Sequence, residues 1–238
     1  MLFPNIKKWI FALALSAAPA VHALPVLQLY VEGGTYDVAS ETWVVTENDF
    51  TVWVIGNTGQ RGTITGANGL GGVSLVVSTQ GGDLANLSIT PTLAGCCDVV
   101  DPSLAGNPIA TLSGTGHHSV LADHGIFNQP GIAWQQFDLG VFALTDSLIG
   151  DATQGAWPVD VDGNFHGQIN AYHVTMLGDF DFLHFDGFGY TNDGRRYVFA
   201  PFSHDAEALP PPPHIEVPVP ATLSLFSLGA FLLARRRK

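Results

Sequence analysis

Short runs of alternating apolar and polar residues recur along most of this chain, and each run ends at a cluster of Gly, Asn, Asp or Pro. Such alternation has the period of a β-strand, in which successive side chains point to opposite faces. The turn residues mark where one strand ends and another begins. The predicted strands cover residues 26–31, 42–46, 50–55, 73–77, 87–90, 134–137, 168–174 and 197–199. Residues 143–149 are the one candidate for a short helix.

Many short strands with frequent turns predict an all-β domain, built as an antiparallel β-sandwich or a jelly-roll-like fold. Residues 24–209 are long enough to enclose one substantial core. The glycine-rich residues 56–72 predict a loop or a long hairpin arm. Residues 210–216 begin with four consecutive prolines and predict an extended linker after the domain.

The N-terminus has the three parts of a signal peptide. Lys7 and Lys8 precede an apolar run, and small residues lead up to Ala23. This order predicts that the Sec translocon exports the chain and that signal peptidase removes residues 1–23 by cleavage after Ala23. An uncleaved signal anchor is the alternative.

The C-terminus has an apolar run followed by four cations, at residues 235–238. Such a flank predicts a transmembrane helix whose basic end stays in the cytoplasm, so the preceding domain lies outside. As a helix, residues 217–234 would be about 27 Å long, slightly less than the about 30 Å core of a bilayer. We therefore expect a temporary stop in the membrane, with a buried terminal helix of the domain as the alternative.

This tail resembles the PEP-CTERM sorting signal. Residues 217–223 read Val-Pro-Val-Pro-Ala-Thr-Leu, with Val219 where the usual motif has Glu, and an apolar stretch and an Arg-rich end follow. The resemblance implies that an exosortase, a membrane cysteine protease or transpeptidase, recognises and removes the tail. It further implies an inner-membrane intermediate, and then the cell surface or an exopolysaccharide-rich extracellular matrix of a Gram-negative-type bacterium. The residues that carry it are Pro218, Pro220, Ala221, Thr222, Arg235, Arg236 and Arg237.

The exported domain itself resembles the choice-of-anchor N proteins. This resemblance implies a surface-directed domain that carries an interchangeable C-terminal anchor, and it assigns no catalytic residues. The blocks that carry it are residues 24–30, 33–37, 41–42, 124–127, 183–186 and 200–206.

Negative charge dominates residues 24–216, where three arginines stand against 21 acidic residues and leave a net charge of −18 with histidine neutral. Nucleic acid and anionic membrane surfaces would repel such a domain, so we expect neither as a partner. Divalent cations, basic partners and neutral glycans remain compatible with this charge. Alternatively, the charge keeps an exported β-domain soluble.

Two short motifs carry candidate chemistry. Cys96 and Cys97 are the only cysteines, and after export they can form a disulfide between neighbours that locks a turn, stay reduced or pair between chains. Asp160, Asp162 and Asn164 place oxygen donors at alternate positions, a pattern suited to calcium. An Asp-Gly turn with solvated carboxylates is the alternative, and calcium is the one cofactor that the sequence suggests.

Acidic and aromatic residues alternate in residues 179–186. As a strand, this stretch would place Phe180 and Phe182 on one face, with Asp179 and Asp181 on the other. Two such carboxylates could form the acid/base pair of a glycosidase, or they could line a solvated strand face.

Several histidines lie near one another or next to a carboxylate: His117, His118, His124 and His204. Neutral imidazole is a good metal ligand, so these side chains could converge on a metal. Alternatively, His124 and His204 hydrogen-bond to neighbouring carboxylates and hold loops in place.

The sequence contains no HExxH motif, nucleophile elbow, phosphate loop or Rossmann fingerprint. We therefore expect a non-enzymatic, exported protein with a structural or interaction role. The alternative is a secreted carbohydrate-active enzyme or a calcium-dependent glycan binder that uses the Asp-rich loops.

Overall fold

The computed structural model describes residues 26–58, 69–92, 107–121, 129–145, 147–151, 166–191, 193–200 and 205–209. Within these ranges the secondary structure is β, apart from one 3-10 turn, η2 (Leu84–Asn86). No helix in these ranges is long and apolar enough to cross a membrane. The signal peptide at residues 1–23, the linker at 210–216 and the sorting signal at 217–238 lie outside the described residues, so their helices stay predictions.

The strands follow one another closely along the chain. In order they are β1 (Leu27–Glu32), β2 (Thr35–Asp37), β3 (Thr42–Val45), β4 (Asp49–Gly56), β5 (Leu70–Thr79), β6 (Leu87–Thr92), β7 (Ile109–Thr115), β8 (Ala133–Phe142), β9 (Ser147–Leu148), β10 (His166–Met176), β11 (Leu183–Thr191), β12 (Tyr197–Phe199) and β13 (Asp205–Ala208). All the predicted strands are confirmed, while residues 143–149 contain β9 in place of the candidate helix.

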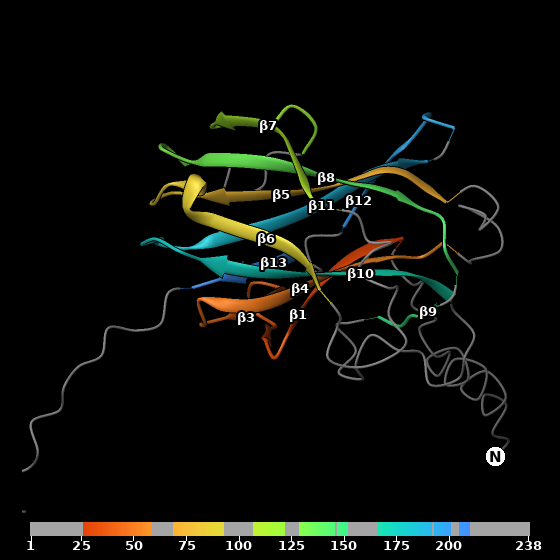
Figure 1. The fold of residues 1–238 in the computed structure, drawn as a ribbon, viewed down its shortest axis with the longest axis horizontal. Coiled ribbons are helices and arrows are strands. Elements are labelled where there is room, and N and C mark those ends of the chain that lie inside the picture. Colours follow the sequence, from red (N-terminus) through yellow and green to blue (C-terminus); the bar gives the residue numbers. More distant parts are fainter. Residues whose placement is uncertain are drawn as a thin grey trace, which may run out of the picture.

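These strands form two sheets that pack against each other (Figure 1). The smaller sheet has the order β1-β4-β10-β6, with β9 paired to β10. The larger sheet has the order β2-β3-β13-β11-β5-β8-β7, with β12 paired to β11. The pairs are antiparallel except for β13 and β3, which run parallel. The fold is therefore the predicted β-sandwich, although its larger sheet is mixed.

The main core lies between the sheets because alternate residues of each strand face inward. In β4, Phe50, Val52 and Val54 join this core. Trp53 and Ile55 point the other way and join a second apolar cluster on the outer face of the smaller sheet. The period-two pattern of the sequence thus supplies apolar residues to both faces of a central strand.

A third apolar cluster covers the outer face of the larger sheet. Val76 and Phe188 from the sheet pack there against Leu121 and Ile132, which belong to the connection between β7 and β8. The larger sheet is therefore buried on its outer side as well, but over part of its surface only. Its edge strand β7 stays exposed along nearly its whole length.

Candidate functional site

Most of the predicted site residues lie outside the described part of the chain. The disulfide, the calcium loop and the processing sites therefore stay predictions. The residues concerned are Ala23, Cys96, Cys97, Asp160, Asp162, Asn164, Pro218, Pro220, Ala221, Thr222, Arg235, Arg236 and Arg237. Among the described residues, no group of three or more His, Cys, Asp or Glu side chains could hold a metal ion.

The acid–aromatic stretch differs from its prediction. β11 begins at Leu183, so residues 179–182 form an irregular connection where strand alternation does not apply. Phe180 joins the main core between the sheets, whereas Phe182 packs on the outer apolar cluster of the larger sheet. The expectation that these two rings share one face is therefore wrong. Asp179 and Asp181 are both exposed.

His118 is fully buried, and its two ring nitrogens have different partners. Nδ1 accepts hydrogen bonds from the backbone N–H groups of Val120 and Leu121, each at 3.2 Å. Because Nδ1 accepts, the ring proton is assigned to Nε2, which lies 3.3 Å from Gln136 Oε1 and donates to it. Gln136 in turn donates to Ser74 Oγ on β5 at 3.2 Å. The neutral ring thus fastens the segment after β7 to the outer face of the larger sheet.

The surroundings of His118 favour this neutral form. Burial lowers the pKa of His118, and the charge of neighbouring His117 lowers it further. The hydrogen bond to Gln136 and the carboxylate of Asp186 raise the pKa; each is a smaller effect than burial, and the His117 effect is smaller still. The imidazole also meets the Trp134 ring edge-on, with centroids 4.5 Å apart. These contacts describe a structural histidine.

Three more titratable side chains share this face of the larger sheet. His184 Nε2 lies 3.6 Å from Asp186 Oδ1, both residues are on β11, and Asp186 is 3 % exposed. Glu207 on β13 stands opposite His184 in the strand register. Burial raises the pKa of the Glu207 carboxyl, while His184 lowers it. His184 and Asp186 are neighbours on one face of β11, but only strand pairing brings Glu207 beside them, so the sequence did not reveal this cluster. His124 and His204 lie outside the described residues.

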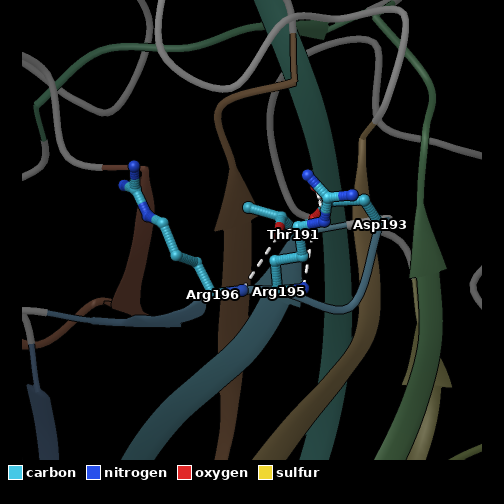
Figure 2. A network of polar contacts seen from close by, with 4 residues as sticks. All are labelled: Thr191, Asp193, Arg195 and Arg196. Carbon is cyan, nitrogen blue, oxygen red and sulfur yellow. Dashed lines mark hydrogen bonds and ion pairs between the residues drawn. The ribbon is translucent and has the colours of Figure 1, made fainter.

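The β11–β12 hairpin is built around the carboxylate of Asp193 (Figure 2). Asp193 Oδ1 accepts hydrogen bonds from Thr191 Oγ1 at 2.5 Å and from the Arg195 backbone N–H at 3.1 Å. The Arg196 backbone N–H donates to Thr191 Oγ1 at 3.2 Å. Gly194 closes the turn at φ +69°, a conformation that glycine adopts without strain. The hairpin therefore holds Arg195 and Arg196 on a defined backbone.

These two arginines are two of the three cations in residues 24–216. Arg195 Nε lies 3.6 Å from Asp193 Oδ2, at 84 % exposure of its side chain. Figure 2 shows the Arg196 guanidinium pointing away from the Asp193–Arg195 pair. The turn thus presents positive charge locally on a strongly negative domain.

Exposed aromatic rings line the strands beside this turn, and we call Tyr190, Tyr197 and Phe199 the aromatic hairpin surface. Tyr190 stands directly opposite Tyr197 in the β11–β12 register. The rings of Tyr197 and Phe199 are stacked, with centroids 6.1 Å apart and an interplanar angle of 29°. The three residues are 40 %, 57 % and 43 % exposed. Exposed rings of this kind are typical of interaction surfaces.

The described residues thus define an acidic β-sandwich with a basic, aromatic hairpin. A family model described as the PEP-CTERM protein-sorting motif matches residues 216–238 of the chain. This match indicates an exported protein targeted to an exosortase, and it supports the resemblance that the tail showed. The motif covers the C-terminal segment alone, so it does not classify the sandwich.

Further comparisons add little about the sandwich. No curated protein matches the chain. Among solved structures, the chain is similar to the C-terminal domain of the Streptococcus agalactiae AgI/II polypeptide BspA, at 10 % identity and a TM-score of 0.31. A second structure, described as BspA_C_WT, matches at 9 % identity and a TM-score of 0.32. Both matches cover 78 % of this chain and 50 % of the other, so this chain spans half the length of those it matches.

Proposed function

We propose that this chain is an exosortase-processed protein of the cell surface or extracellular matrix, with a structural or interaction role and no catalysis. The observation that carries the proposal is the sorting motif at residues 216–238, which follows a folded β-domain. In this account the Sec translocon exports the chain and signal peptidase cleaves after Ala23. The tail then holds the protein in the inner membrane until the exosortase removes it. The resemblance of the domain to choice-of-anchor N proteins supports the same route.

Two of the described polar side chains, His118 and Asp193, have roles that support this proposal. His118 accepts two backbone N–H groups and fastens a segment to the sheet. Asp193 holds a turn by accepting from Thr191 and Arg195. These side chains have structural tasks, which is how a scaffold or binding domain uses them.

Mass spectrometry of both ends of the protein recovered from its host tests the proposal. We expect an N-terminus at Leu24 and loss of the tail, and we expect the tail to be retained in a host that lacks its exosortase. Pro220→Ala should slow removal of the tail, whereas the matched change Pro212→Ala in the linker should not. Protein found in the cytosol with Met1 and Lys238 both present would refute the proposal.

A second candidate function is glycan binding, and the aromatic hairpin surface favours it. Sugar rings stack on exposed aromatic faces, and an arginine fork binds the carboxylate of an acidic sugar. Binding of glycans to the exported protein should weaken in Tyr197→Ala and persist in Leu177→Ala, since Leu177 is exposed on a different connection. Equal glycan binding by both variants would show that the aromatic hairpin surface is not the glycan site.

The same preparation tests the enzymatic and calcium-dependent forms of this candidate. Release of reducing sugar from a glycan would indicate a hydrolase, and a single carboxylate substitution that abolished the release would identify its acid or base. Calcium binding at Asp160 and Asp162 would produce heat in a calorimetric titration and raise the melting temperature. The absence of both signals would remove calcium from the account.

A further inference from the structure

β1, β6, β2 and β7 end the two sheets, and β9 and β12 also pair on one side only among the described strands. All of these strands except β7 have features that discourage pairing with another chain, and β9 and β12 are only two and three residues long. β2 is three residues long and ends in Asp37. β6 contains Pro91, which has no backbone N–H to donate. β1 ends in Glu32 and is buried along most of its length. Short length, proline, charge and covering are the usual means by which proteins protect a sheet edge.

β7 has none of these features. It is seven residues long, has no proline or charged residue, and pairs with β8 alone among the described strands (Figure 1). Every residue of β7 is exposed except Gly114, against which the ring of Trp134 lies. Its apolar side chains Ile109 and Leu112 are 63 % and 55 % exposed. One bulge, between Ala110 and Leu112, interrupts an otherwise regular ladder.

The sequence around β7 also lacks the acidic residues that are frequent in the rest of the domain. Residues 102–122 contain no Asp, Glu, Lys or Arg, although the exported region carries a net charge of −18. Two copies of such a domain repel each other over most of their surfaces. Contact through β7 is a way for them to meet without placing carboxylates opposite carboxylates.

We propose that β7 pairs with β7 of a second copy of this chain, in antiparallel orientation. The pairing continues the larger sheet from one molecule into the next and satisfies the backbone groups on the edge of β7 that has no partner among the described strands. The same strand serves both partners, so the contact closes as a two-fold symmetric dimer and does not propagate into a filament. Exposed Leu112 contributes apolar contact across the junction.

Sedimentation of the exported protein over a range of concentrations tests the pairing. We expect a reversible dimer that tightens as salt rises from about 0.01 M to about 1 M, because the Debye length falls from about 30 Å to about 3 Å and the repulsion between copies is screened. Hydrogen exchange should slow in residues 109–115 when the dimer forms. Leu112→Glu should weaken association about tenfold or more, because it places like charges near each other across the new strand pair.

The matched control is Leu177→Glu, since Leu177 is also exposed, at 70 %, but follows β10 of the smaller sheet, whereas β7 belongs to the larger sheet. It should leave the dimer intact. If Leu112→Glu proves misfolded by circular dichroism, Ser113→Asp provides the same test at a neighbouring exposed position. A monomer under all conditions, a dimer that Leu112→Glu and Ser113→Asp leave intact, or slowed exchange confined to other strands overturns the proposal. These measurements do not depend on tail processing, so their failure would leave the export proposal untouched.

Discussion

Removing the imidazole of His118 is expected to destabilise the sandwich strongly. The ring is fully buried and takes part in three hydrogen bonds, two of them accepted from the backbone N–H groups of Val120 and Leu121. His118→Ala deletes all three bonds and leaves a space beside Trp134. Ser119, the next residue along, is exposed, which makes Ser119→Ala the matched control.

The size of the loss follows from these contacts. A net contribution of about 1 kcal/mol for each hydrogen bond gives about 3 kcal/mol, and the unpaired N–H of buried Leu121 adds about 1 kcal/mol or more. We therefore expect His118→Ala to lower the free energy of unfolding by about 4 kcal/mol. The control should change it by less than about 0.5 kcal/mol, as is usual for exposed positions.

The pH dependence provides an independent test of the same contacts. The pKa of His118 in the folded protein lies below the value of about 6.5 in the unfolded chain, so the unfolded chain takes up its proton first as pH falls. The contribution of His118 is therefore fully present above pH about 6.5 and is lost as pH falls from there toward the folded pKa. The slope for this single proton is at most about 1.4 kcal/mol per pH unit.

Urea unfolding followed by tryptophan fluorescence measures both effects, with pH varied between about 7.5 and 5. The difference in unfolding free energy between the native protein and His118→Ala isolates the histidine from the other titrating groups. This difference should shrink as pH falls. A difference that stays constant with pH, or a loss as small as that of the control, would show that Nδ1 does not accept the two N–H groups.

Three further substitutions probe other contacts. Tyr172→Phe removes the hydroxyl that accepts a hydrogen bond from Asn170 Nδ2, and it should lower the free energy of unfolding in urea by about 1–2 kcal/mol. In the native protein burial raises the pKa of Tyr172 to about 12. The phenolate absorbance that appears near that pH should therefore be missing from the variant. Gly187→Val should cost about 1–3 kcal/mol, because even a Cβ at Gly187 would lie 3.3 Å from Leu29 Cδ2 on the facing sheet; an unchanged melting temperature would contradict this packing. Asp193→Ala should speed amide hydrogen exchange in the β11–β12 turn. Hydrogen bonds lower the pKa of Asp193, so acid should speed exchange in the native protein only at a pH below the usual pKa range of an aspartate. Equal exchange in both proteins would argue against the carboxylate as the centre of the turn.

The regular strands of the sandwich were predictable because their apolar residues recur with the period of the backbone. Residues 50–55 and 168–174 are examples, and both lie within strands of the smaller sheet. β2, β7, β9, β11 and β13 were not among the predicted strands, and small, polar and glycine residues give β7, β11 and β13 little apolar alternation. Pairing with neighbouring strands stabilises these strands, and the sequence of one strand does not identify the strand with which it pairs.

The side chains with candidate chemistry were less predictable than the strands. His118 and Asp186 were visible as polar residues, but their proximity results from the packing of the β7–β8 connection on β11. The prediction that Phe180 and Phe182 lie on one face was wrong, because side chains alternate in this way only within a strand and both residues precede β11. The processing sites were recognised from order and composition, and the match at residues 216–238 supports that recognition for the sorting motif.

What the amino-acid order determined by itself is local: the strand period, the acidic balance of the exported region and the terminal sorting motif. Each depends on neighbours in the chain, or on charge summed over it, and needs no contact between distant segments. Tertiary structure alone decided that β13 runs parallel to β3, that His184 faces Glu207 and that β7 pairs with β8 alone among the described strands. These outcomes depend on strand register and sheet order, which are set when distant segments bury their apolar faces together.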